Sequence, residues 1–310
     1  MTRTGILLVN LGSPTNAQEM KTFLYNMFSD VAILPFPTIP RKALAFVISN
    51  LRFRNSWRKY ELIGGSPLKT SMNAICEALQ TELGNNFEVL AAYSYSQPSF
   101  KQGLDTFNKQ GIKTVKIIPL LPHSSISTTG SVERDFGKLK RNYPDVDLQI
   151  LKPFPTNKNF IAYWVELVQV AISRSKFIYP TLLFSAHAIP AYQLPLGDTY
   201  VDEINASAQA IASTLGLNHQ VAFQSKIGRV EWVGPDTKDC LKNMHSKGID
   251  EIILVPISFI NENLETLYDQ DIEIIPYANN ELGIKHITRA HIPHSHPLLI
   301  DTLKDLLEES

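Results

Sequence analysis

Two distant segments of the chain carry the same pattern, and this repeat limits the folds that the sequence can adopt. The segments are KQGIKTVKIIPLLP (109–122) and SKGIDEIILVPISF (246–259). Each has a Gly-Ile pair, two polar or charged residues, an apolar run, and a proline at the same place, Pro119 or Pro256. Self-similarity of this kind predicts two related halves, each built around its own small sheet.

Short apolar runs recur along the whole chain and indicate the fold class. They are continuous rather than alternating, which is typical of parallel strands buried on both faces. The runs lie at 5–11, 88–95, 114–122, 147–154, 181–187, 221–226 and 251–259. Helix-like stretches lie between them at 67–84, 99–110, 158–175, 200–215 and 236–247, and a Ser/Thr-rich loop is expected at 121–136. Alternating strands and helices predict an α/β protein with two similar Rossmann-like halves, each a small parallel β-sheet flanked by helices.

The break between the halves is expected near the stretch PFPTNKNF. This gives an N-terminal α/β half over residues 1–157 and a C-terminal half over 158–310. Parallel sheets bind ligands outside the carboxyl ends of their strands. The sequence therefore predicts an active site in the cleft between the halves.

The composition is that of an ordinary globular protein and excludes several classes. The chain has 310 residues, 44% of them hydrophobic and 19% charged, with a formal net charge of −1. A near-neutral charge argues against a general nucleic-acid binder. Cys76 and Cys240 lie far apart, so neither a disulfide framework nor a cysteine metal cluster is indicated. A strand-like start and the lack of a membrane-length apolar run lead us to expect a cytoplasmic protein.

Residues 31–60 depart from this average because they contain no acidic residue. Six basic residues stand there among Phe, Leu, Ile and Trp. One interpretation is a partly exposed helix pair whose long basic side chains extend to water. The other is an apolar, cationic lip that meets a flat anionic ligand or a membrane surface.

The segment NENLETLYDQDIEI (261–274) has the opposite character. Its carboxylates Glu265, Asp269 and Glu273 are spaced i, i+4, i+8, which places them on one face of an expected α-helix. No Lys or Arg follows until Lys285, so the like charges have no basic partner nearby in the sequence. A solvated helix face is the ordinary interpretation, but interleaved apolar residues indicate that the helix is partly buried.

His187 ends the apolar run LLFSAH, and Glu265 follows another strand. Both are therefore expected at the carboxyl edge of the same sheet. A structural histidine at a strand end is the simpler interpretation. A His beside carboxylates also suits a divalent metal such as Fe²⁺ or Zn²⁺, or acid–base chemistry.

Taken together, the motifs resemble the ferrochelatase family, the enzymes that insert Fe²⁺ into a porphyrin. The similarity runs nearly end to end. It rests on LLVNLGSP (7–14), YELIGGSPL (60–68), STTGS (127–131), FSAHAIP (184–190), QSKIGRVEWVGPDT (224–237) and VPISFINENLETLYDQDIE (255–273). The chain is identified as a member of this family, which implies the chelatase fold and a lyase reaction.

The resemblance implies a role for each matching residue. His187 and Glu265 would be catalytic, and with Asp269 and Glu273 they would form a line of metal ligands. That line would deliver Fe²⁺ or carry away the protons released by the ring. The porphyrin contacts implied by the matching positions are Leu11, Ser66, Tyr95, Ser131, Trp232 and Phe259, together with the lip at 31–60.

The chain also departs from the family pattern. Asn263 stands where many relatives have His, Ser94 where many have Arg, and LPHSS replaces a Tyr-Pro-Gln-aromatic-Ser stretch, with substitutions at Leu121, His123 and Ser124. The coproporphyrin branch has Tyr in place of Leu11 and lacks the TTGS pattern. The resemblance therefore implies the protoporphyrin type.

The expected activity is insertion of Fe²⁺ into protoporphyrin IX to form protohaem, the terminal step of haem biosynthesis. The alternatives are a chelatase for coproporphyrin III or sirohydrochlorin, a non-catalytic porphyrin- or haem-binding homologue, and a two-lobed small-molecule binding module. Fe²⁺ would be a substrate, with no prosthetic group and no iron–sulfur cluster. The expected partners are a porphyrin and ferrous iron, with no nucleic acid. We expect a cytoplasmic monomer with peripheral contact at the inner membrane through residues 31–60.

Overall fold

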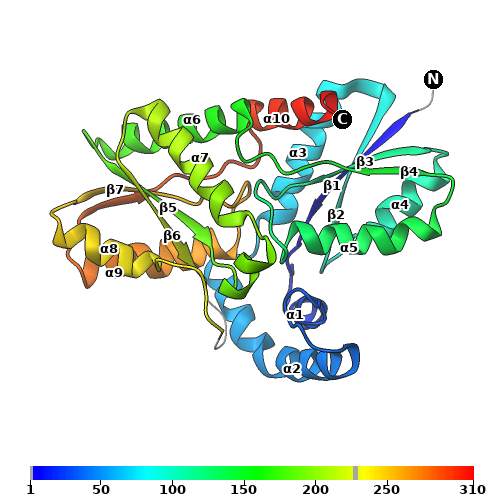
Figure 1. The fold of residues 1–310 in the computed structure, drawn as a ribbon, viewed down its shortest axis with the longest axis horizontal. Helices are drawn as coiled ribbons and strands as arrows, with labels where there is room; N and C mark the ends of the chain where they lie inside the picture. The colour runs from blue at the N-terminus through cyan, green and yellow to red at the C-terminus, as the bar shows by residue number, and fades with distance from the viewer. Residues whose placement is uncertain (1–2, 226–229) are drawn as a thin grey trace. The chain divides into compact units, whose positions relative to one another are not determined.

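The computed structural model describes residues 3–225 and 230–310, which form two compact α/β units (Figure 1). Unit 1 runs from the N-terminus to Leu121 and includes Ser125–Pro153 and His294–Ser310. Unit 2 consists of Pro122–Ser124 and Phe154–Pro293. The predicted α/β class and the two similar parallel sheets are confirmed.

Unit 1 is built on a four-stranded parallel sheet in the order β2-β1-β3-β4. Its strands are β1 (Thr4–Asn10), β2 (Phe87–Tyr93), β3 (Thr114–Pro119) and β4 (Asp147–Ile150). Its helices are α1 (Ala17–Phe28), α2 (Thr38–Leu62), α3 (Leu68–Leu83), α4 (Phe100–Lys109), α5 (Thr129–Leu139) and α10 (Pro297–Glu308). Leu7, Val9 and Ile117 alternate onto one face of the sheet and pack with α4 and α5, while α3 and α10 cover the other face (Figure 1).

Unit 2 repeats this plan with the strand order β6-β5-β7-β8, again all parallel. Its strands are β5 (Thr181–His187), β6 (His219–Gln224), β7 (Glu251–Val255) and β8 (His286–Arg289). Its helices are α6 (Lys158–Ser175), α7 (Tyr200–Leu215), α8 (Thr237–Ser246), a π-helix (Glu265–Ile274) and α9 (Ile275–Asn280). Leu183, Ala222 and Leu254 pack with α8, the π-helix and α9, whereas α6 and α7 lie against the opposite face (Figure 1).

The internal repeat of the sequence corresponds to a structural repeat. β3 and β7 hold the same place in their sheets, each beside the central strand β1 or β5. Before each strand a helix ends at a glycine with positive φ, Gly111 at +74° and Gly248 at +73°. Only glycine adopts this conformation without steric cost, so the shared Gly-Ile pair marks the same turn in both units.

Several expected elements differ from those observed, and backbone chemistry explains most of the differences. The run 251–259 forms a strand only to Val255; Pro256 has no N–H to extend the ladder, and the equivalent Pro119 is likewise the last residue of β3. Part of the expected loop at 121–136 is helical, since α5 begins at Thr129. The edge strand β8 was not expected, because Ile287 is the only apolar residue among its four.

The domain division also differs from the single boundary expected at residue 157. Residues 294–310 belong to unit 1 rather than to the second half. The apolar face of α10, which includes the buried Leu299 and Leu303, packs on α3. The contact is flanked by a hydrogen bond of 2.8 Å between Ser71 Oγ and His294 Nδ1.

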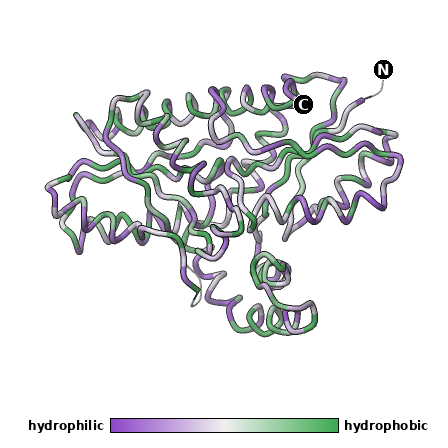
Figure 2. Tube along the Cα trace, viewed as in Figure 1, coloured by the Kyte–Doolittle hydropathy of each residue, from purple (hydrophilic) through white to green (hydrophobic). Residues whose placement is uncertain are grey.

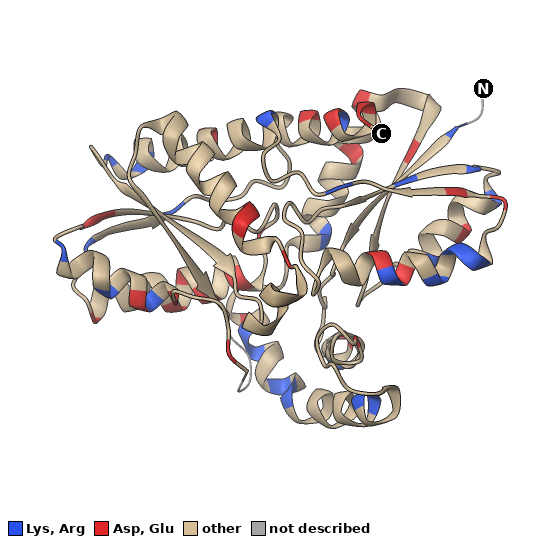
Figure 3. Ribbon diagram, viewed as in Figure 1, with Lys and Arg blue, Asp and Glu red and all other residues tan. Residues whose placement is uncertain are grey.

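The expected lip is dominated by α2, which leaves much of its apolar surface uncovered. Its buried residues are Ala45, Ser49 and Tyr60, and the small pair Ala45 and Ser49 lies one helical turn apart. Apolar and polar positions are mixed along the helix (Figure 2), and the charged residues of its basic stretch are blue in Figure 3. Across the described residues, no helix combines the length and hydropathy of a membrane span.

Candidate active site

His187 is the last residue of β5, at the carboxyl end of a central strand, as the sequence predicted. The strand is buried up to Ala186, and the His187 side chain is 31% exposed. Ser258, just beyond β7, accepts a hydrogen bond of 3.1 Å from the His187 backbone N–H through its Oγ. The imidazole therefore emerges from a rigid strand at the sheet edge where parallel sheets bind ligands.

The acidic segment forms a π-helix rather than the expected α-helix. Hydrogen bonds in a π-helix reach from residue i to i+5, and such turns are found frequently at functional sites. Four residues are slightly more than one α-helical turn and slightly less than one π-helical turn, so Glu265, Asp269 and Glu273 still follow one side.

Asn263 fixes the start of the π-helix. Its Oδ1 accepts the backbone N–H of Glu265 at 2.8 Å and of Thr266 at 3.1 Å. Asn is among the best residues for capping free N–H groups at a helix start. Asn263 thus supplies a cap that holds the backbone of Glu265 at the start of the π-helix.

His187 and Glu265 meet at the centre of the site. Nδ1 of His187 lies 3.2 Å from Oε2 of Glu265. Apart from this mutual contact, neither atom has a hydrogen-bond partner within residues 3–225 and 230–310. Burial lowers the pKa of His187, but the negative charges of Glu265 and Asp269 outweigh it and raise this pKa above its ordinary value. The imidazole of His187 can therefore act as a base, and the carboxylate of Glu265 beside it can act as an anionic ligand.

The remaining predicted metal ligands form a row rather than a cluster. The carboxylate of Asp269 accepts a hydrogen bond of 2.6 Å from Ser225 Oγ, and Ser225 has a left-handed backbone with φ of 65°. A serine rarely adopts this conformation, and strained residues of this kind concentrate at functional sites. In the described part of the chain, no three His, Cys, Asp or Glu side chains are grouped closely enough to hold one ion.

Two other carboxylates of the acidic segment have a different role, which sequence reasoning missed. Arg289, fully buried at the end of β8, donates to Glu262 at 2.9 Å and to Asp271 at 2.7 Å. Burial raises the pKa of Glu262, but its contacts with His291, Arg289 and Thr266 and the Ile292 N–H lower it to about 2. Because its basic partner comes from a neighbouring strand, the charge compensation is invisible in the local sequence.

Two of the six predicted porphyrin contacts lie in unit 2 near the end of β5. Trp232 pairs through its backbone with Pro190, three residues after His187, and its Nε1 has no hydrogen-bond partner among the described residues. Phe259 follows Ser258 and is partly exposed. Residues 226–229 of the predicted Trp loop lie outside the described residues.

The other four predicted contacts lie in unit 1. The Tyr95 hydroxyl donates to Asp30 at 2.8 Å, and the Ser131 hydroxyl donates to the same carboxylate. Leu11 accepts the Tyr95 backbone N–H at 3.0 Å. Ser66 lies apart from this group and accepts the N–H of Leu68 at the start of α3.

Asp30, which follows α1, holds this group together, and no local sequence pattern predicted that role. Its side chain is 10% exposed and lies 3.5 Å from Arg134. Burial raises the pKa of Asp30, but hydrogen bonds from Ser131, Ala32 and Tyr95 and the charge of Arg134 lower it below its ordinary value. The two hydroxyls proposed as ring contacts are therefore already bonded to a buried carboxylate that anchors the start of the lip.

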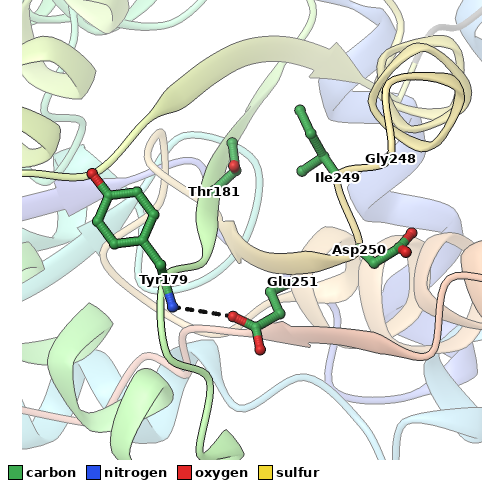
Figure 4. A pocket seen from close by; sticks show the side chains of 6 residues that line it. All are labelled: Tyr179, Thr181, Gly248, Ile249, Asp250 and Glu251. Atoms are coloured by element: carbon green, nitrogen blue, oxygen red, sulfur yellow. Dashed lines mark hydrogen bonds between the residues drawn. The ribbon is translucent and has the colours of Figure 1, made fainter.

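A pocket of about 330 Å³ lies at the opposite edge of the unit 2 sheet (Figure 4). It is lined by Thr181 and Glu251, the first residues of β5 and β7, together with Tyr179 and residues 248–250. The Glu251 carboxylate accepts backbone N–H groups of Ile178 and Tyr179 at 3.1 Å each. Because this carboxylate is bonded to the backbone and His187 lies at the other end of β5, the pocket is not part of the site.

The fold and site together define the class of protein. The structure of SirB from Bacillus subtilis with Fe³⁺ matches with a TM-score of 0.62 and 12% identity, covering 99% of this chain and 95% of that one. CbiX, described as the terminal enzyme of sirohaem biosynthesis in denitrifying bacteria, matches with a TM-score of 0.56, 12% identity and 99% coverage of both chains. The chain has the chelatase fold.

The sequence comparisons identify the family. The sequence model of the ferrochelatase family matches residues 3–310. A ferrochelatase of Gloeothece citriformis is 35% identical over 323 residues, covering 100% of this chain and 83% of that protein. A ferrochelatase of Synechocystis is 35% identical over 325 residues with the same coverage. The chain belongs to the ferrochelatase family.

Proposed function

We propose that the protein inserts Fe²⁺ into protoporphyrin IX to form protohaem. As a ferrochelatase-family enzyme it is a metal chelatase, classed as a lyase, whose substrates are a porphyrin and ferrous iron. The observation that carries the proposal is the His187–Glu265 pair, 3.2 Å apart at the carboxyl end of β5.

The reaction must move two protons as well as one metal ion. Fe²⁺ enters the ring as the two pyrrole N–H protons leave, so the charge of the macrocycle is unchanged. His187, with a pKa raised by Glu265 and Asp269, is suited to accept a proton at the ring centre. Asp269 and Glu273 continue the row of carboxylates, which would attract the cation and pass protons outward.

The choice of protoporphyrin rests on unit 1. Leu11 stands where the coproporphyrin branch has Tyr, and STTGS contributes the start of α5. An apolar side chain at position 11 favours a ring edge without an additional carboxylate. Coproporphyrin III is the alternative substrate.

The test is anaerobic absorbance spectroscopy with Fe²⁺ and one ring in each cuvette: protoporphyrin IX, coproporphyrin III or sirohydrochlorin. We expect catalytic conversion of protoporphyrin to haem, which His187→Ala abolishes while its far-UV circular dichroism stays unchanged. Turnover with another ring alone would overturn the substrate, and a spectral change that stops at one equivalent would indicate a binder. Full activity of His187→Ala would remove the site assignment.

We further propose that α2 contacts the surface of the inner membrane. Ile39, Phe46 and Leu51 are 84%, 59% and 75% exposed, and the acid-free stretch around them carries six basic residues. Exposed apolar side chains among cations suit an anionic lipid surface. Co-sedimentation with phosphatidylglycerol vesicles tests this; Phe46→Ser with Leu51→Ser should weaken binding, and equal binding by that variant would contradict it.

A further inference from the structure

Four uncharged polar side chains are buried beneath the His187–Glu265 pair, and the proposed reaction uses none of them. They are Ser185, Gln224, Thr237 and Gln270, with exposures of 0%, 3%, 1% and 0%. They come from four elements: β5, β6, the start of α8 and the π-helix. Ser185 lies two residues before His187 and therefore on the same face of β5.

Gln224 connects these elements. Its Oε1 accepts a hydrogen bond of 2.6 Å from Ser185 Oγ and one of 2.8 Å from Gln270 Nε2. Its Nε2 lies 3.4 Å from the backbone carbonyl of Glu265, to which it donates. One amide therefore joins the strand that carries His187 to two points of the π-helix that carries Glu265.

Stability alone is a poor reason for this network. Buried polar groups cost free energy unless each is hydrogen-bonded, and apolar side chains would fill the same space. The network is incomplete, since Oε1 of Gln270 has no partner within the described residues. What these directed bonds provide, and apolar packing would not, is a fixed position of the π-helix relative to β5.

We propose that Gln224 is a positioning residue for metal insertion, which fixes the Glu265 backbone relative to His187. The inference rests on the proposed function, because it assigns Gln224 to the metal step of that reaction. Partners that orient metal-binding side chains typically change metal affinity or activity by about 10- to 100-fold when they are replaced. Small displacements of reacting groups have effects of similar size.

Gln224→Met removes the amide and keeps the length of the side chain. We expect kcat/KM for Fe²⁺, per folded protein, to fall by about 10- to 100-fold, with the KM for the porphyrin unchanged. Gln220→Met is the matched control, because Gln220 lies on the same face of β6 and accepts from Cys240 Sγ at 2.9 Å, away from the pair. It should behave as the unmodified protein does.

A second variant separates positioning from folding. Gln270→Leu removes the π-helix side chain that donates to Gln224. It should therefore lower kcat/KM for Fe²⁺ in the same selective way. It tests the positioning role if Gln224→Met is insoluble. Adding Gln270→Leu to Gln224→Met should cause little further loss of activity, since both substitutions remove the same hydrogen bond.

The outcomes are distinguishable. A Gln224→Met enzyme whose kcat/KM for Fe²⁺ stays within about twofold of Gln220→Met, or whose porphyrin KM rises in the same proportion, overturns the positioning role. Absence of turnover by the unmodified protein refutes the proposed function, and this inference falls with it.

Discussion

Replacing Arg289 with Met should destabilise the protein strongly and in a pH-dependent way. Arg289 is fully buried and bonds to Glu262 and Asp271, and the Glu262 side chain is only 11% exposed. The substitution leaves Glu262 as a buried charge without its cation. Removing one partner of a buried ion pair typically costs about 3–5 kcal/mol.

The depressed pKa of Glu262 reflects all the contacts that favour its charged form, the hydrogen bond with His291 first and the charge of Arg289 next. It lies at about 2 in the folded protein, against an ordinary value of 4.5. At about 1.4 kcal/mol per pKa unit, this difference corresponds to about 3 kcal/mol of stability. Because the folded-state pKa is depressed, that stability is present above pH 4.5 and is lost as the pH falls towards 2.

In Arg289→Met the burial of Glu262 is no longer opposed by the Arg289 charge, so its pKa rises. Acid then neutralises the buried, unpaired carboxylate of Glu262 in the variant, while it begins to weaken the native protein. The difference in the free energy of unfolding between the two should therefore be largest at pH 7 and smaller at pH 4. Adding Glu262→Gln to the variant should recover part of the loss at pH 7.

Urea unfolding at pH 7 and pH 4, followed by circular dichroism and by tryptophan fluorescence, to which the buried Trp164 contributes, measures this difference. Lys101→Met is the control, because it removes an ion pair of 2.7 Å to Asp105 on the exposed face of α4 and should change little. A difference below about 1 kcal/mol at pH 7, or one that does not depend on pH, would refute the reasoning.

Three further predictions follow from the site. Asn263→Ala should lower the free energy of unfolding by about 1 kcal/mol and slow iron insertion, whereas Asn263→Asp should retain both; urea unfolding and steady-state rates decide. Glu273→Gln should raise the KM for Fe²⁺ by less than about tenfold and leave kcat near the unmodified value; an unchanged KM would remove the relay role. Asp30→Ala should cost about 2–3 kcal/mol in urea unfolding, because it leaves the buried hydroxyls of Tyr95 and Ser131 without their acceptor. A cost near zero would show that water replaces the carboxylate.

The sequence predicts the fold well where one local pattern decides the structure. The run TLLFSAH forms β5 at Thr181–His187, and the helices expected at 158–175 and 200–215 have those bounds in the structure. The boundaries are sharp because apolar continuity, capping groups and glycine turns act within a few residues. The same locality places His187 at the edge of its sheet.

The parts that the sequence did not reveal depend on contacts between distant segments. Arg289 follows Glu262 by 27 positions and Asp30 precedes Ser131 by 101, so no local pattern links either pair. The π-helix was expected as an α-helix because i, i+4 carboxylates suit both geometries. The network around Gln224 was missed for the same reason, since its members belong to four separate elements.

The return of the chain to unit 1 at His294 makes Phe154–Pro293, the main part of unit 2, an insertion within unit 1. A protein cut after residue 157 would lack α10, so the face of α3 that α10 covers would be exposed and the Lys304–Glu82 ion pair would be absent. The inserted segment Phe154–Pro293, by contrast, contains the His187–Glu265 pair and the residues that hold it. The groups to which the proposed reaction assigns the metal thus lie in one continuous stretch of chain, while the helix that closes the first unit comes from the far end of the sequence.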